Sequence, residues 1–410
     1  MNNFKFIILI LILFFITISL SGCYNNVDLT ELAVATALGF DRADQGHIKV
    51  TVQIVKPGVM KARTQGSEEE PVWVFSATGE TVFSAIRNLL TTVNRKVFFS
   101  HLQLIVISEE IASEGIIDLL DLLERDQEIK RTATILLARG ISAEEILQAK
   151  TELENIPAIH ISSLVDNVDA LAKSRKIILI DLLKSFNLSG KAATIGTIQK
   201  SIGKTERENN QKKNSNDGQE SKDKNELQVK DLSVTGAAVF KRDKLIGYLD
   251  EFETRGLLFV LDEIEGGVIN VNNPQEEEKM VAFEIVNSST ELDVDINEEN
   301  TRLFVKVKAE GRLADQQGRG DLTTPEMVEK IENSVARVIE INIRQVVDKA
   351  QKEYQLDYFG FSEILYKDHL SYWKKVENDW SNIFSQLPID IEVEWKTSSS
   401  SLINKSSEAR

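Results

Sequence analysis

Histidine and cysteine are the side chains best suited to hold a metal ion or to act as a nucleophile, and both are scarce in this chain. Its 410 residues include four histidines and one cysteine. The histidines are His47, His101, His160 and His369, and none of them stands in an HExxH pattern. Without a second cysteine, the usual structural zinc sites cannot be built. We therefore expect no metal site and no cofactor, with each histidine in an ordinary surface or packed position.

Motifs for phosphate binding and for serine nucleophiles are incomplete. Gly203–Thr205 matches the end of a phosphate loop, but Ile198 occupies the position that requires glycine. Ser201–Lys204 and Ser371–Lys374 have the SxxK spacing of penicillin-recognising enzymes. The accompanying SxN, Ser185–Asn187, precedes both, and the chain has neither KTG nor GxSxG. These spacings indicate coincidence.

Paired carboxylates are the remaining candidates for acid–base chemistry. Glu109-Glu110 and Asp262-Glu263 are adjacent pairs, and adjacent residues on a helix do not point to one face. Acids near a helix start are also favoured by the helix dipole. We therefore predict no catalytic residue and a protein that is not an enzyme. An exported hydrolase with a carboxylate pair is an alternative that these residues leave open.

Cys23 is the one residue with a definable covalent chemistry. The stretch Phe6–Leu20 is apolar apart from Thr17 and Ser19. As a helix it would be about 22 Å long, short of the ~30 Å hydrocarbon core of a bilayer. It ends in Leu20-Ser21-Gly22-Cys23, which fits the lipobox of bacterial lipoproteins. We predict cleavage between Gly22 and Cys23 and attachment of acyl chains such as palmitate to Cys23. An uncleaved membrane anchor with an incidental cysteine is the other interpretation.

The overall charge excludes some partners. The chain has 48 Lys and Arg against 64 Asp and Glu, a net charge of −16. Binding of nucleic acid requires clustered cations, so we expect no nucleic-acid partner. The same sign argues against a protein that lies flat on anionic lipid.

Hydrophobic patterning predicts a mixed α/β protein. Residues 48–54 alternate as a half-buried strand, and residues 102–107 and 132–139 are short apolar strands separated by helical patterns. Ser142 and Glu145 have capping-box spacing at a helix start, as do Thr323 and Glu326. Further helices are expected over 108–126, 157–172, 177–186 and 364–384, and a last strand over 389–395 with an acidic outer face.

Composition divides the chain into segments. We expect a lipoprotein signal peptide over 1–22, an N-terminal α/β domain over 23–190 and a small β-rich middle domain over 191–265. Residues 204–230 have almost no apolar side chains, which predicts a disordered loop within that middle domain. A C-terminal α+β domain over 266–398 and a flexible tail over 399–410 complete the chain.

Two short segments have an unusual composition but contain no recognisable catalytic motif. Residues 236–249 read as a strand, a charged turn at Lys241–Lys244 and a second strand, followed by Glu253 and Arg255. This is either a plain hairpin with a nearby Glu–Arg pair or a surface that docks a partner. The other string is Asp357–Glu363, DYFGFSE, whose aromatics form either a core at a helix junction or an exposed patch.

These strings, with GCYNNVDLTELAVATALGFDR from Gly22 and HLQLIVISEEIASEGIIDLLDLLERDQEI from His101, resemble the Ger(x)C family. Members are C subunits of the nutrient germinant receptors of bacterial spores. The resemblance runs from Cys23 to about Trp395, with departures at Ser362, where glycine is expected, and His369, where proline is common.

The resemblance implies a lipoprotein of three mixed α/β domains on the outer face of the spore inner membrane. It would assemble with a membrane A subunit and a permease-like B subunit and trigger germination in response to nutrients. The family has no established catalytic residues, so only Cys23 is carried over as a site, and ligand-binding residues stay unassigned. The alternative is an extracytoplasmic solute-binding lipoprotein that captures the germinant directly.

Overall fold

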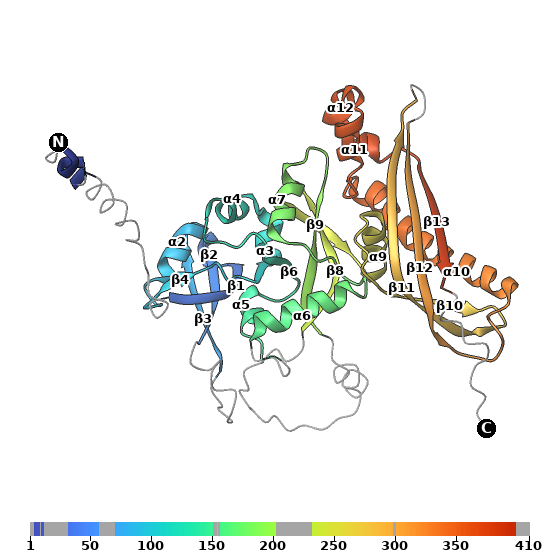
Figure 1. Cartoon of the computed structure of the whole chain (residues 1–410), viewed down its shortest axis with the longest axis horizontal. Helices are drawn as coiled ribbons and strands as arrows, with labels where there is room; N and C mark the ends of the chain where they lie inside the picture. Colours follow the sequence, from blue (N-terminus) through green and yellow to red (C-terminus); the bar gives the residue numbers. More distant parts are fainter. Residues whose placement is uncertain are drawn as a thin grey trace.

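The computed structural model describes residues 4–8, 10–11, 32–56, 70–150, 154, 156–201, 232–297 and 301–398. Within these residues the chain forms two β-sheets with helices packed against them (Figure 1). Gly22, Cys23, the loop 204–230 and the tail 399–410 lie outside the described residues. The predictions made for them therefore stay predictions.

The first sheet contains nine strands. Its order is β3-β2-β1-β5-β6-β7-β8-β9, and β4 pairs with the start of β1. The pairs β1/β4, β1/β5, β5/β6 and β6/β7 are parallel, and the pairs β3/β2, β2/β1, β7/β8 and β8/β9 are antiparallel. The strands are β1 (Leu32–Arg42), β2 (Ile48–Val55), β3 (Val72–Gly79), β4 (Lys96–Phe98), β5 (Leu104–Ser108), β6 (Thr134–Ala138), β7 (Ala193–Lys200), β8 (Leu232–Lys241) and β9 (Lys244–Leu249).

Helices cover both faces of this sheet, because its central strands are apolar on both sides. Every residue of β5 and of β6 is buried, as a parallel strand between two helical layers requires. One face packs against α2 (Val82–Leu89), α3 (Glu109–Glu114), α4 (Ile117–Arg125) and α7 (Leu179–Asn187). The other packs against α5 (Ala143–Leu147) and α6 (Pro157–Asp169).

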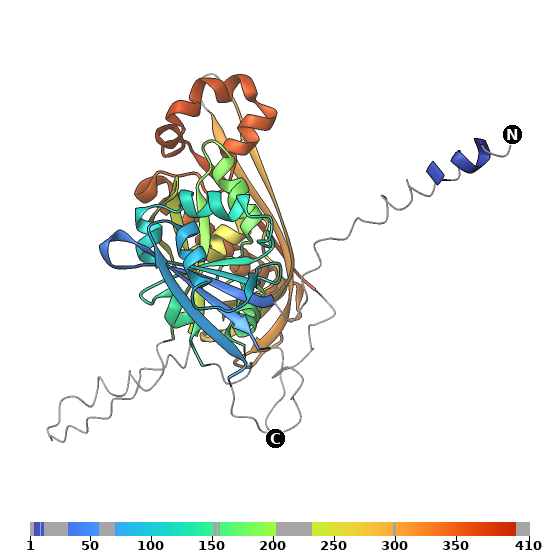
Figure 2. The ribbon, with the colours of Figure 1, turned by 90° about the vertical axis from the view of Figure 1, so that its left-hand side faces the viewer.

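The second sheet has the order β10-β11-β12-β13, with β13 parallel to β12. Its strands are β10 (Val268–Asn273), β11 (Glu276–Asp295), β12 (Arg302–Gln316) and β13 (Ile389–Thr397). One face packs against α9 (Glu251–Val260) and the long helix α10 (Pro325–Asp348). The short helices α11 (Phe361–Asp368), α12 (Leu370–Val376) and α13 (Trp380–Phe384) follow, and Figure 2 shows α11 and α12 as a projection at one end of the molecule.

The strands assigned to a separate middle domain extend the first sheet instead. Leu137 and Ala138 of β6 pair in parallel with Thr197 and Ile198 of β7, and β8 and β9 continue outward from β7. In this respect the structure differs from the boundary expected at residue 190. Side chains of β7 and β8 belong to two different hydrophobic cores. Ala193 and Ala238 pack into the core that β1 and β5 form with α2, α3, α4 and α7, whereas Ala237 packs into the core of the second sheet and α10.

Two predicted helices are broken in the structure. The segment 108–126 forms α3 and α4, separated by Gly115, whose φ of 134° is accessible mainly to glycine. The segment 364–384 forms α11, α12 and α13, and His369, with a φ of −133°, lies between the first two. The spacing of apolar residues does not predict these breaks, because the same helical spacing continues on both sides of each break.

The predicted helix caps are partly confirmed. Ser142 and Glu145 form the expected capping box of α5, with the Ser142 hydroxyl accepting from the Glu145 N–H at 3.1 Å. The cap of α10 is Thr324, not Thr323, whose own hydroxyl donates to Asp321. Both residues are threonines, so residue type alone cannot tell which of them caps the helix. That depends on the backbone conformation before α10, where Thr324 is extended.

Candidate functional site: the junction between the two sheets

The residues considered for metal binding or catalysis do not converge. His47 and His101 lie in loops of the first sheet, His160 lies on α6, and His369 lies between α11 and α12. Among the described residues, no group of three or more His, Cys, Asp or Glu side chains is placed to hold a metal ion. His101 is exposed, and the other three histidines are half-buried.

In the two adjacent acid pairs, Asp262, Glu263 and Glu109 each contact a different partner. Asp262 accepts a hydrogen bond from the backbone N–H of Thr290 at 2.8 Å, whereas Glu263 forms a two-pronged ion pair with Arg175 at 2.6 and 2.8 Å. Glu109 accepts from the backbone N–H of Gly140. Each of these three carboxylates is therefore held in a structural contact.

The two unusual strings lie at one place, the junction between the sheets. Tyr354, in a π-helical turn (Lys349–Tyr354) after α10, places its hydroxyl 3.0 Å from both the backbone nitrogen and the backbone oxygen of Tyr248 in β9. A Cβ on Gly247 would lie 2.4 Å from that hydroxyl, so glycine is required for the approach. Lys349 binds both carboxylate oxygens of Glu253 at 3.0 and 2.8 Å.

The expected Glu253–Arg255 pair is therefore wrong: Glu253 contacts Lys349 instead. Arg255 is buried, and its burial lowers the pKa of its guanidinium. The next residue, Gly256, lies where α9 crosses α10, and a Cβ there would be 2.2 Å from the carbonyl oxygen of Asn342. The close helix crossing explains the glycine after Arg255.

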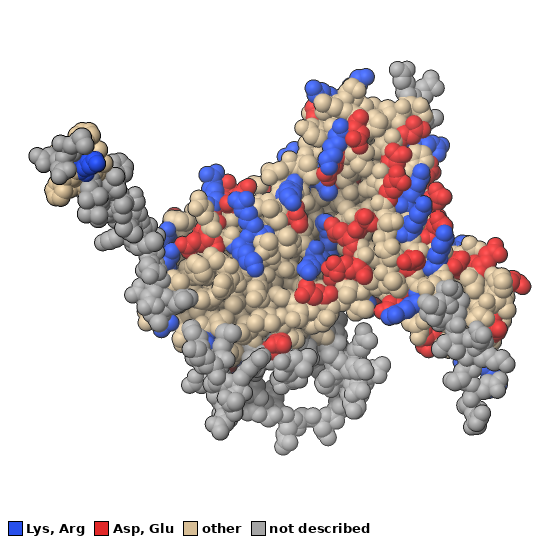
Figure 3. All heavy atoms as spheres, in the orientation of Figure 1, with Lys and Arg blue, Asp and Glu red and all other residues tan. Residues whose placement is uncertain are grey.

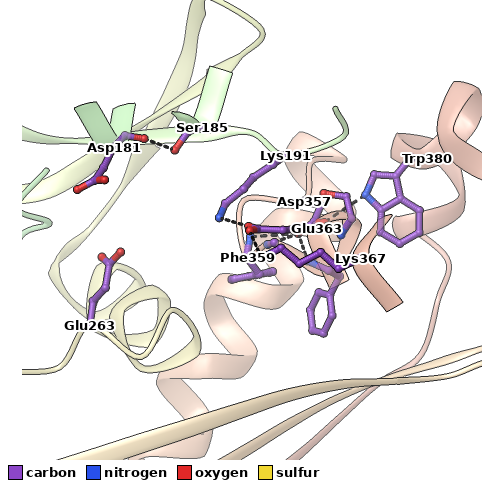
Figure 4. Close-up of polar contacts among 12 residues, drawn as sticks. Asp181, Ser185, Lys191, Glu263, Asp357, Phe359, Glu363, Lys367 and Trp380 are labelled. Carbon is purple, nitrogen blue, oxygen red and sulfur yellow. Dashed lines mark hydrogen bonds and ion pairs between the residues drawn. The ribbon is translucent and has the colours of Figure 1, made fainter. Parts of the chain in front are cut away.

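Asp357 organises the second string. It is 1% exposed, and its two carboxylate oxygens accept five hydrogen bonds (Figure 4). Four come from the backbone N–H groups of residues 359–362, at 2.7 to 3.3 Å, and the fifth from the indole of Trp380 at 3.2 Å. Burial raises the pKa of Asp357, and these donors oppose the shift.

The aromatic residues around Asp357 form core rather than an exposed patch. Tyr358, Phe359 and Phe361 are at most 2% exposed, and Phe359 and Phe361 pack against Phe384. Ser362, a departure from the family pattern, is fully buried and donates its backbone N–H to Asp357. The structural interpretation of this string is therefore confirmed.

The segment 190–192 of the first sheet attaches directly to this loop. The backbone N–H of Ala192 donates to the carbonyl of Asp357 at 2.8 Å, and Lys191 contacts Glu363 at 3.3 Å, as Figure 4 shows. Gly190 approaches Trp373 so closely that a Cβ would lie 2.6 Å from its ring. These contacts couple both sheets. Sequence reasoning missed Gly190 and Lys191 because each partner is more than 170 residues away.

The outer face of the second sheet is charged but internally balanced. Lys306 and Lys308 of β12 lie opposite Glu392 and Glu394 of β13, and Lys306 lies opposite Glu291 of β11. Figure 3 shows the corresponding columns of acidic and basic side chains over this sheet. The acidic outer face predicted for the last strand is confirmed, and it forms part of a solvated charge ladder.

Known proteins share both halves of this architecture. Residues 25–200 match the model of the spore germination protein N-terminal domain, and residues 235–401 match that of the spore germination B3/GerAC-like C-terminal domain. The chain belongs to the Ger(x)C family. The junction described above connects the parts of the chain that these two matches cover.

Relatives of Bacillus subtilis (strain 168) align over nearly the whole chain. Spore germination protein KC is 28% identical, with 92% of this chain and 91% of the relative aligned. Spore germination protein B3 is 24% identical, with 94% and 96% aligned. The crystal structure of the GerBC protein matches with a TM-score of 0.52 at 20% identity, covering 88% of this chain and 96% of that one, which shows a shared fold.

Proposed function

We propose that this chain is the lipid-anchored, non-catalytic C subunit of a spore germinant receptor, attached at Cys23 to the outer face of the spore inner membrane and assembled with membrane A and B subunits. Membership of the Ger(x)C family is the observation that carries this proposal. Three further facts support it: the lipobox at Leu20–Cys23, the separated histidines, and the carboxylates held in structural contacts.

Attachment through lipid is consistent with the described part of the chain. In that part, no helix combines the length and apolarity needed to span a bilayer. Acyl chains on Cys23 would hold the protein at the membrane, and two chains hold far more firmly than one.

The test compares spores carrying Cys23→Ala with spores carrying Ser19→Ala, a change in the same segment outside the lipobox. We expect Cys23→Ala to remove the protein from the membrane fraction and to slow nutrient-triggered germination, while Ser19→Ala behaves as the parent. Membrane-bound Cys23→Ala protein with normal germination would contradict the proposal. Purification of the receptor through this chain should recover the A and B subunits, and their absence would contradict the assembly.

A further inference from the structure

One end of the first sheet contains the first residue of β1, the first strand along the chain. β1 begins there at Leu32, which pairs with Lys96 at the start of β4. In the antiparallel ladder, Ile54 lies beside Ala35 and Trp73 lies beside Ile54, so β2 ends and β3 begins at this same end. Helix α2 follows the far end of β3, where Asn88 donates to the carbonyl of Thr78 at 2.8 Å, and residues 90–95 lead from the helix to β4 at this end.

The distance from this end to Cys23 is short. Leu32 is nine residues after Cys23, and nine fully extended residues span at most about 30 Å. A short connection also keeps this end at high effective concentration next to whatever holds Cys23. The surface around the start of β1 is therefore the part of the fold that meets the bilayer most often if Cys23 carries lipid.

This surface exposes apolar side chains. Trp73 at this end is 44% exposed, Leu90 at the start of the connection to β4 is 46% exposed, and Phe83 on α2 is 53% exposed. The other three tryptophans, Trp373, Trp380 and Trp395, are at most 3% exposed. Tryptophan favours the headgroup region of a bilayer, because its ring is apolar and its N–H is polar.

Basic side chains accompany these apolar ones. Lys56 lies over the Trp73 ring at 5.2 Å, and the Arg87 guanidinium lies over the Phe83 ring at 4.9 Å. Arg95 is exposed, and no ion pair joins Lys56, Arg87 or Arg95 to an acid within the described residues.

Arg87 and Arg95 lie in a stretch that has no acidic residue of its own, although exposed Glu80 directly precedes it. Residues 81–101 contain no aspartate or glutamate, in a chain with 64 acids. Two nearby acids, Glu70 and Glu128, are each paired with a lysine. The connection 57–69 carries two basic and two acidic residues, while Asp28 and Glu31 precede β1.

We propose that these residues form a membrane-docking surface, the tether rim, made of Lys56, Trp73, Arg87, Leu90 and Arg95. Its partner is an anionic lipid surface: Trp73 and Leu90 enter the headgroup region, and the three cations contact lipid phosphates. This rests on the proposed lipid anchor at Cys23. The negative charge of the whole chain opposes flat binding, but only this end needs to touch the bilayer, and electrostatic attraction acts over about a Debye length.

Tryptophan fluorescence tests the rim. The full-length protein is incorporated into vesicles of phosphatidylcholine and phosphatidylglycerol whose acyl chains are brominated. Flotation with the vesicles measures attachment of the protein, and quenching of tryptophan emission measures contact of a tryptophan with the brominated lipid. Trp73 is one tryptophan of four, so we expect partial quenching that disappears in Trp73→Phe. Floating protein whose emission is unquenched would overturn the rim and leave the anchor intact.

Two further comparisons separate the causes. Arg87→Glu with Arg95→Glu should reduce quenching at least several-fold, whereas Lys374→Glu with Lys375→Glu, exposed on α12, should leave it unchanged. Equal effects of both pairs would overturn the local charge argument. If the native protein does not float with the vesicles, the anchor proposal fails. The tether rim can then still be tested by coupling Cys23 to a maleimide lipid and measuring the quenching of Trp73. Shielding of Trp73 only when the membrane subunits are present would assign the rim to protein and overturn the lipid assignment.

Discussion

The hydroxyl of Tyr354 bonds to both backbone polar groups of Tyr248, accepting from its N–H and donating to its carbonyl, each at 3.0 Å. Tyr248 lies in β9, which is the edge strand of the first sheet and, among the described strands, pairs with β8 alone. An edge strand leaves such groups open to other chains. A single side chain from the turn after α10 therefore closes this part of the edge and joins the two sheets.

Replacing Tyr354 with phenylalanine keeps the ring and removes both hydrogen bonds. Because the backbone groups of Tyr248 are then left without this partner, we expect a loss of about 1–3 kcal/mol in the free energy of unfolding. Hydrogen exchange at the Tyr248 amide should also become faster. Tyr366→Phe is the matched control, since Tyr366 is 56% exposed. Equal stability of both variants would show that the bridge contributes nothing.

Gly247→Ala should destabilise the junction, because the added methyl group would lie 2.4 Å from the Tyr354 hydroxyl. Forced overpacking of this kind costs about 1–3 kcal/mol. Removal of the opposing ring should relieve the clash, so the double change Gly247→Ala and Tyr354→Ala should cost less than the sum of the two single changes. Denaturant unfolding of the four proteins measures this coupling, and strict additivity would contradict the contact.

Asp357→Asn should be more damaging than its small size suggests. The amide places an NH2 group where one carboxylate oxygen now accepts from the peptide N–H of Ser362 and the indole of Trp380, so donors would face donors. Buried groups left without partners in this way cost roughly 3 kcal/mol in total. Asp368→Asn, on the exposed end of α11, is the control. Thermal unfolding that shifts equally in both variants would contradict the role of Asp357.

Asp169 gives the protein a pH-dependent stability. Burial, together with the nearby charge of Glu265, raises the pKa of Asp169 from 3.8 to about 6. The folded state therefore binds more protons than the unfolded state between these values. The stabilisation is fully present below about pH 4 and is lost as the pH rises through 6.

Asp169→Asn removes this titration. We expect the variant to be more stable than the parent at pH 7.5, by roughly 1–2 kcal/mol after allowing for partial hydration of the carboxyl group, and the difference to shrink toward pH 4.5. Urea unfolding at the two pH values measures both quantities. Asp118→Asn on the exposed face of α4 should show no such change. If the difference in stability between the parent and Asp169→Asn does not change with pH, the raised pKa of Asp169 is contradicted.

Much of the local structure follows from the sequence. Alternation over residues 389–395 predicted β13 and its acidic face, and the spacing of Ser142 and Glu145 predicted the cap of α5. The charged turn after Phe240 predicted the β8–β9 hairpin. The proposed lipidation of Cys23 likewise rests on four consecutive residues. Each of these features depends on neighbours within a few positions, which is the range over which residue type and backbone geometry are directly linked.

Only the tertiary structure decided how these parts join. The pairing of β6 with β7 merges the expected middle domain into the first sheet, and Tyr354, Gly190 and Lys191 acquire their roles from partners 106 to 183 positions away. Glu253 pairs with Lys349 rather than with Arg255 for the same reason. The sequence determined which segments are strands and helices, whereas burial of the aromatics at 358–361 was decided by the tertiary structure. Which of them meet depends on packing between distant segments, because contacts of this kind follow from the shape of the whole fold and leave no periodic signal in the chain.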